Sequence, residues 1–201
     1  MGYEIELKAH VADAEGTARR IGGFADFLFA YEKKDVYWFN AAADLPSGVR
    51  VRTESRTAAD GARSCHTLVT YKRQEKRGGL EVNEEKEFCA TPSGVARQGG
   101  ESAAAVVGEL LARAGFSAGF TKAKSGSCWR CTPPDAPVLP VTVELSLVEP
   151  LGWFLELEII RGTKRHAHAA RLVLYDVLEK AGISPACIEP RYYAEMLQEK
   201  R

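Results

Sequence analysis

Polar and apolar residues alternate along much of the chain, a pattern that is typical of β-strands with one apolar face. The first segment is the clearest, because Glu4, Glu6 and Lys8 alternate with apolar residues. Glycine-rich and proline-containing turn segments separate most of the segments that follow. The strands predicted in this way span residues 3–11, 34–40, 49–56, 65–74, 80–88, 119–131, 138–149 and 153–161.

Other segments have the spacing and the end signals of helices. Asp13 is expected to cap a short helix over residues 13–21, which a glycine pair ends. Further helices are predicted over residues 91–114, 165–181 and 190–199. There is no fixed repeat, low-complexity segment or linker in the sequence, so residues 1–201 are predicted to form one α+β domain.

The predicted strands carry many charged residues on one face, since strand residues two apart share a face. Acidic residues come in pairs on some strands, and basic residues come in pairs on others. These positions are Glu4, Glu6 and Lys8; Arg50 and Arg52; Lys72; Glu81, Asn83, Glu85 and Glu87; Lys122 and Lys124; Glu144 and Ser146; and Glu156 and Glu158.

Two interpretations of these charged faces are open. In the first, they are the solvated faces of an ordinary antiparallel sheet. In the second, the sheet closes into a barrel with its charges inside, while amphipathic helices cover its apolar outer face. Enclosed charges need partners. Carboxylates suit Mg²⁺ or Mn²⁺, and lysine and arginine suit phosphate, so a metal-bound polyphosphate would satisfy both sets.

Composition narrows the classes of partner. The 27 Lys and Arg residues equal the 27 Asp and Glu residues, so the net charge is about zero. This balance argues against a general nucleic-acid or anionic-membrane binder. There is no apolar stretch of signal-peptide or membrane-spanning type, which favours the cytoplasm. Five scattered cysteines do not indicate a disulfide framework.

Several motifs resemble, in order along the chain, those of the CYTH superfamily, also called triphosphate tunnel metalloenzymes. Residues 4–8 (EIELK) match the E-x-E-x-K signature, and residues 148–158 (VEPLGWFLELE) are similar to V-x-x-L-G-x-F-x-E-x-E. The resemblance covers nearly the whole chain. Between these two motifs, and after the second, it rests on residues 35–37 (DVY), 49–52 (VRVR), 68–72 (LVTYK), 83–88 (NEEKEF), 122–124 (KAK) and 188–193 (IEPRYY).

The resemblance implies a closed, antiparallel, eight-stranded β-barrel with a polar tunnel, flanked by helices. It implies one or two Mg²⁺ or Mn²⁺ ions and a small molecule that contains a triphosphate. The metal-site carboxylates would be Glu4, Glu6, Glu156 and Glu158, and the phosphate ligands would be Lys8, Arg50, Arg52, Lys72, Lys122 and Lys124. Shared strand phase adds Glu85 and Glu87 as residues that position a water.

Two positions depart from the family pattern. Ser146 stands where the family usually has Asp, and serine is a poorer ligand for a hard cation. Glu144, two residues earlier on the same face, is a candidate substitute for that ligand. Lys124 replaces the more usual Arg, which gives up bidentate contact with phosphate.

Three functions remain open from the sequence. The first is metal-dependent hydrolysis of inorganic triphosphate, thiamine triphosphate or a nucleoside triphosphate. The second is adenylate cyclase activity, which makes cyclic AMP and pyrophosphate from ATP. The third is a binding module for polyphosphate or nucleotide without catalysis. Because some members of the family form dimers, a homodimer is also an alternative.

Overall fold

The computed structural model describes residues 2–40, 48–73, 76–77, 80–90, 102–161 and 167–200; the side chains of residues 72–80 and 167 lie outside this description. The strands are β1 Gly2–His10, β2 Asp26–Phe39, β3 Val49–Ala58, β4 Arg63–Arg73, β5 Lys76–Arg77, β6 Leu80–Cys89, β7 Ser117–Cys131, β8 Val141–Glu149 and β9 Gly152–Arg161. The helices are α1 Ala14–Gly22, α2 Ala103–Arg113, α3 Ala167–Lys180, the 3₁₀ turn η2 Pro185–Cys187 and α4 Tyr193–Glu199.

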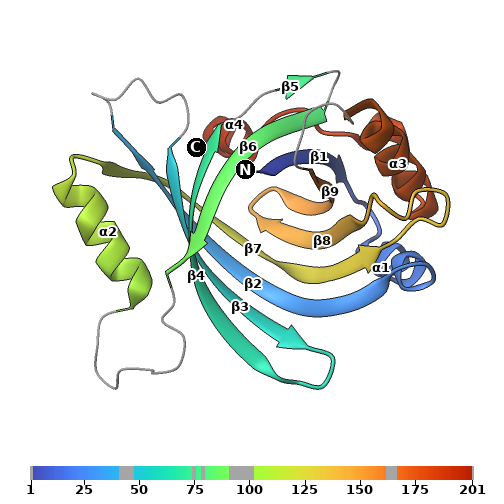
Figure 1. Cartoon of the computed structure of the whole chain (residues 1–201), viewed down its shortest axis with the longest axis horizontal. Coiled ribbons are helices and arrows are strands. Elements are labelled where there is room, and N and C mark those ends of the chain that lie inside the picture. The colour runs from blue at the N-terminus through green and yellow to red at the C-terminus, as the bar shows by residue number, and fades with distance from the viewer. Residues whose placement is uncertain are drawn as a thin grey trace.

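Eight of the strands form one closed antiparallel barrel (Figure 1). Their order around the ring is β1, β9, β8, β7, β2, β3, β4 and β6, and the pairing of β6 with β1 completes the circle. The short strand β5 pairs with the start of β6. The predicted fold class, a closed barrel flanked by helices, is therefore confirmed.

The alternation on β1 separates the apolar core from the barrel interior. Ile5 and Leu7 are almost fully buried on the outer face, in the same cluster as Leu174 and Leu178 of α3. Each such side chain stabilises the fold by about 1.5–3 kcal/mol. The main core thus lies outside the barrel wall, where α1 and α3 cover it (Figure 1). The interior is left to polar and charged side chains.

The other two α-helices lie elsewhere on the barrel. α2 packs against β3 and β7, and its Gly108 lets the ring of Trp38 approach closely, since a Cβ there would lie 3.0 Å from that ring. α4 packs through Tyr193 and Met196 against Phe154 of β9. Among the described residues, no helix has both the length and the apolar character needed to cross a membrane.

Several element boundaries differ from the sequence prediction. β2 begins at Asp26 rather than at residue 34, because residues 26–33 pair with β7 and β3 although their sequence lacks a clear alternation. β8 begins at Val141 rather than at residue 138, since Pro140 has no N–H to donate to a ladder.

Differences also occur among the helices. The predicted helix over 91–114 is described from Ser102, which caps α2, and residues 91–101 lie outside the described part. The last helix begins at Tyr193 rather than at residue 190. The 3₁₀ turn η2, which begins after its cap Ser184, was not predicted.

Candidate active site

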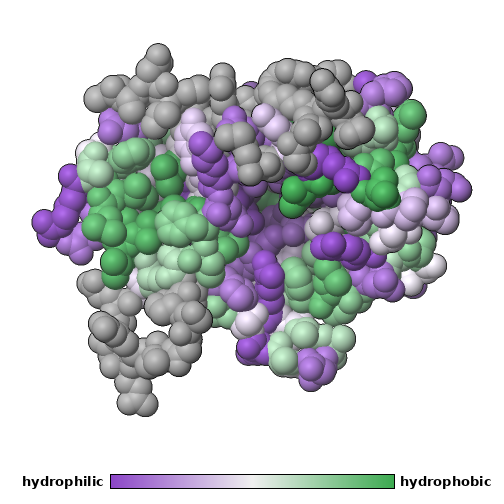
Figure 2. Space-filling model, in the orientation of Figure 1, coloured by the Kyte–Doolittle hydropathy of each residue, from purple (hydrophilic) through white to green (hydrophobic). Residues whose placement is uncertain are grey.

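A cavity of about 420 Å³ lies inside the barrel and is lined from all eight barrel strands and from α4. Figure 2 shows hydrophilic residues gathered in the hollow on this face. Among the described residues, the lining has nine carboxylates and seven basic side chains. The predicted site residues that line it are Glu4, Glu6, Lys8, Arg50, Arg52, Glu85, Glu87, Lys122, Lys124, Glu144, Glu156 and Glu158. Lys72 is the exception, since its side chain is outside the described part.

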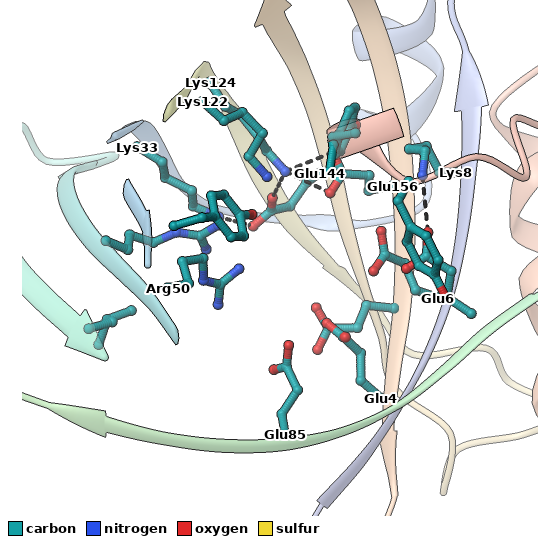
Figure 3. Close-up of a pocket in the computed structure, with 18 of the residues that line it drawn as sticks. Glu4, Glu6, Lys8, Lys33, Arg50, Glu85, Lys122, Lys124, Glu144 and Glu156 are labelled. Carbon is teal, nitrogen blue, oxygen red and sulfur yellow. Dashed lines mark hydrogen bonds and ion pairs between the residues drawn. The ribbon is translucent and has the colours of Figure 1, made fainter. Parts of the chain in front are cut away.

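Charges of one sign predominate on each of two walls of the cavity, although Lys8 pairs with a carboxylate of the acidic side and Glu144 lies among the lysines (Figure 3). A basic wall carries Lys33 on β2, Arg50 and Arg52 on β3, and Lys122 and Lys124 on β7. Facing it, an acidic wall carries Glu4 and Glu6 on β1, Glu81 and Glu85 on β6, and Glu158 on β9. The barrel therefore presents opposite charges across one cavity.

Three carboxylates stand side by side in the acidic wall. Glu6 lies directly opposite Glu158 on one neighbouring strand and opposite Glu81 on the other. Lys8 forms an ion pair with Glu81 at 3.1 Å. Like charges at facing positions of a sheet repel each other. The acidic wall is therefore expected to attract cations.

Asp35 organises the basic wall from behind. Its side chain is fully buried and accepts two hydrogen bonds from the Arg52 guanidinium, at 2.7 and 2.9 Å. Lys122 reaches the same carboxylate at 3.3 Å. Burial alone would raise the pKa of Asp35, but the charges of Arg52 and Lys122 outweigh it and hold the pKa well below its usual range. Asp35 stays ionised and fixes both cations.

Arg50 lies at the edge of the same wall. Its guanidinium donates to the Thr70 hydroxyl at 2.9 Å and to Glu87 at 3.3 Å, and Thr70 donates to Glu87 at 2.7 Å. Glu87 therefore orients Arg50. Glu85, two residues before Glu87 on β6, lies with the carboxylates of the acidic wall (Figure 3).

Lys124 lies between two carboxylates at the centre of the cavity. Its ammonium group is 2.7 Å from Glu144 and 2.7 Å from Glu156. Burial alone would raise the pKa of Glu156, but the Lys124 charge outweighs it and lowers that pKa to about 2. The Tyr193 hydroxyl donates to Glu156 at 2.6 Å, and burial raises the pKa of this tyrosine well above its usual value. Tyr193 therefore remains a neutral donor.

The comparisons with known proteins concern the fold. No known family model and no curated protein sequence matches the chain. Among solved structures, protein PH1819 of Pyrococcus horikoshii OT3 has a TM-score of 0.76 and 23% identity, over 98% of this chain and 99% of that one. A protein of Vibrio parahaemolyticus described as a candidate adenylate cyclase has a TM-score of 0.73 and 16% identity, over 98% of both chains.

A plant protein matches as well. HpAC1 from Hippeastrum, an adenylyl cyclase candidate with a dominant triphosphatase activity, has a TM-score of 0.63 and 14% identity, over 100% of this chain and 97% of that one. The cyclase and triphosphatase structures share the CYTH-type, eight-stranded antiparallel barrel. This chain has the same fold, a closed eight-stranded antiparallel barrel. At these identities the likeness establishes the fold alone, and the chemistry has to come from the cavity.

The residues of this barrel fit a metal ion on one wall and not at the centre. Glu4, Glu6 and Glu158 are hard oxygen donors on neighbouring strands, which suits Mg²⁺ or Mn²⁺. Within the described ranges, no three Asp, Glu, His or Cys side chains are already arranged as ligands of one ion. Metal binding on the acidic wall would therefore require these side chains to turn toward a common point.

Glu144 and Glu156 do not fit a metal ion as they stand, because lysine ammonium groups already contact both carboxylates. The proposed substitution of Glu144 for the missing Asp thus meets an obstacle. Ser146 itself is fully buried, two residues along the same strand.

Several residues of the site were not predicted, among them Lys33, Glu81 and Tyr193 of the cavity lining and Asp35 behind it. Lys33, Asp35 and Glu81 each alternate in phase with predicted positions on the same strand or the next, so strand phase could have found them. Tyr193 comes from α4, and no periodicity in the sequence indicates that a residue of this helix reaches the barrel interior.

Proposed function

We propose that this protein hydrolyses a triphosphate compound with the help of Mg²⁺ or Mn²⁺. The observation that carries the proposal is the pair of opposed walls, acidic and basic, across one cavity of about 420 Å³. Among the described residues, carboxylates outnumber bases in the lining, so a bare polyphosphate anion would be repelled. A polyphosphate that carries divalent cations matches both walls. The triphosphatase activity of the Hippeastrum protein supports the same reaction.

Each wall has its own task in this proposal. Arg50, Arg52 and Lys122, with Lys8 from the opposite wall, would hold the phosphate oxygens, while Glu4, Glu6 and Glu158 would hold the ion. Lys124, also predicted as a phosphate ligand, is instead engaged with Glu144 and Glu156. When bound, a divalent ion neutralises charge that develops on the phosphate oxygens. The strands fix the basic side chains, so the terminal phosphorus is presented to water in one orientation.

Glu85 is the proposed water-positioning residue, because it lies on the acidic wall opposite Arg50 (Figure 3). Its carboxylate would accept a proton from the attacking water as the terminal P–O–P bond breaks, orthophosphate forms and the remaining diphosphate part of the substrate leaves. Glu87, also predicted for this role, is instead engaged with Arg50 and Thr70. We assign to Glu87 the orientation of Arg50.

The first test is a product analysis. Purified protein is incubated with Mg²⁺ or Mn²⁺ and, separately, with ATP, thiamine triphosphate and inorganic triphosphate. We expect orthophosphate from at least one substrate, and its release should be lost in Glu6→Gln. Cyclic AMP with equimolar pyrophosphate would show a cyclase instead. Bound triphosphate with no product would leave a binding module and refute hydrolysis.

An aromatic cluster in the cavity lining, called here the aromatic mouth and formed by Tyr37, Phe39 and Phe120, favours an organic substrate over inorganic triphosphate. Tyr37 and Phe120 line the cavity and stack at 4.2 Å, and Phe39 beside them is 40% exposed. The Phe39 ring occupies space that Gly48 and Gly119 leave clear, since a Cβ at either position would come within 3 Å of it. A base or thiazolium ring at this mouth would cover an apolar surface that inorganic triphosphate leaves exposed.

This mouth gives a substrate-specific prediction. Phe39→Ala should raise the KM for ATP or thiamine triphosphate about fivefold, the loss of roughly 1 kcal/mol of aromatic contact. The KM for inorganic triphosphate should not change. Phe27→Ala is the matched control, because Phe27 lies on the same strand, is 41% exposed and packs near Trp129 rather than in the cavity. An equal effect on all three substrates would contradict an organic subsite.

A further inference from the structure

The centre of the barrel contains a pair of carboxylates that needs positive charge. Glu144 on β8 and Glu156 on β9 face each other across the two strands. Their side chains are 16% and 15% exposed, so solvent screens their repulsion little. Two carboxylates at such a position are a common arrangement for a bridging divalent cation.

Lysine ammonium groups occupy this position instead. Lys124 contacts one oxygen of Glu144 at 2.7 Å and both oxygens of Glu156 at 2.7 and 2.8 Å. Lys33 contacts the other oxygen of Glu144 at 2.5 Å. Both lysine side chains are nearly fully buried, at 6% exposure or less. They come from β2 and β7, which pair directly at these two residues.

Two tyrosines supply the remaining hydrogen bonds to this pair of carboxylates. Tyr31 donates to Glu144 at 2.9 Å, and Tyr193 donates to Glu156 at 2.6 Å. All four oxygens of the two carboxylates therefore have at least one close donor. A metal ion could reach them only by displacing a buried ammonium group, which would then lose its own partners.

The net charge of these carboxylates and lysines, and the side chain at position 146, are both consistent with lysines in place of a metal ion. Two ammonium groups carry the charge of one divalent cation. Ser146, fully buried two residues further along β8, supplies a hydroxyl, which is a poorer ligand for a hard cation than a carboxylate. The local set thus has two carboxylates and two ammonium groups, and it is neutral without a metal.

We propose that Lys33 and Lys124 act as a built-in replacement for a second metal ion, so that this chain binds one divalent ion per triphosphate, on the acidic wall. This inference rests on the proposed function for the first ion. It goes beyond that function by fixing the number and the place of the ions. The ammonium groups also keep the centre neutral when the ion leaves with its product.

The test counts bound Mn²⁺ by electron paramagnetic resonance, in the presence of a non-hydrolysable imido analogue of inorganic triphosphate. We expect one tight ion per wild-type chain. The variant Lys33→Met/Ser146→Asp removes one ammonium group and adds a carboxylate, and it should bind two. Lys34→Met is the matched control, since Lys34 is the exposed neighbour on the same strand, and it should bind one.

The place of the single ion is tested by two glutamine variants. Glu6→Gln should weaken Mn²⁺ binding at least tenfold, whereas Glu144→Gln should leave its affinity within about twofold. Thermal melting with and without Mn²⁺ is a second readout for the double variant, whose midpoint should rise more with Mn²⁺ than that of the wild type.

The possible outcomes separate the two proposals. Two ions on the wild type would overturn the inference and leave the proposed function intact. One ion on both the wild type and the double variant, with no added thermal response to Mn²⁺, would show that the lysines do not hold the place of an ion. No ion on the wild type in the presence of the analogue would overturn both the inference and metal-dependent hydrolysis.

Discussion

Asp35→Ala is expected to lower the free energy of unfolding by about 3–5 kcal/mol, since it leaves buried charges without their partner. Asp35 is fully buried and is shared by Arg52 and Lys122. Without the carboxylate, two like charges would face each other in a closed barrel. Urea denaturation followed by tryptophan fluorescence measures the change, as a shift in midpoint at constant slope.

A neighbouring acidic residue provides the control for this prediction. Glu32 lies on the same strand but is exposed, so Glu32→Ala should change stability by less than about 1 kcal/mol. If Asp35→Ala were as mild as this control, Asp35 would not anchor the basic wall. An intermediate loss is expected for Asp35→Asn, which keeps the shape and two polar atoms but removes the charge.

Arg50→Met is expected to reduce kcat/KM by about 100-fold or more, the size of effect seen when one preorganised donor to a developing charge is removed. Arg50 lines the cavity, and its exposed fraction is only 14%. Its partners Thr70 and Glu87 orient the guanidinium toward the site. Arg50→Lys should recover part of the loss, because it keeps the charge but not the bidentate geometry. Steady-state kinetics with the substrate found by product analysis measures the effect.

The matched control for Arg50 is Arg130→Met, since Arg130 is an exposed arginine on β7 that does not line the cavity. This variant should keep full activity. Urea denaturation should show that Arg50→Met remains folded, because Arg50 lies at the rim of the ion-pair network. A folded Arg50→Met variant with unchanged kcat/KM would remove this arginine from the set of phosphate ligands.

The strand phase could be predicted from the sequence where the alternation was strong. On β1 the acids and Lys8 face the cavity as expected, because every second residue is apolar and packs on the helices outside. The same reasoning failed for the first half of β2. Residues 27–31 are consecutive apolar residues, and such a run gives no period-two signal.

Partner choice inside the barrel could not be predicted. Strand phase shows that Lys124, Glu144 and Glu156 share the interior, but not that the lysine lies between the two carboxylates. That contact depends on the register of β7, β8 and β9, which loop lengths and packing decide together. The position of Tyr193 depends likewise on how α4 packs against β9.

The place of β1 in the ring has a consequence for how the protein is made. β1 is the first strand to leave the ribosome, yet it pairs with β6 and with β9, which ends at Arg161. The pairings of β1 with β9 span most of the chain, and contacts of such sequence separation form slowly. Glu6 can meet Glu158 only after most of the chain has been synthesised. We therefore expect the proposed site to stay incomplete in the nascent chain until β9 has emerged, with a sheet edge open until then.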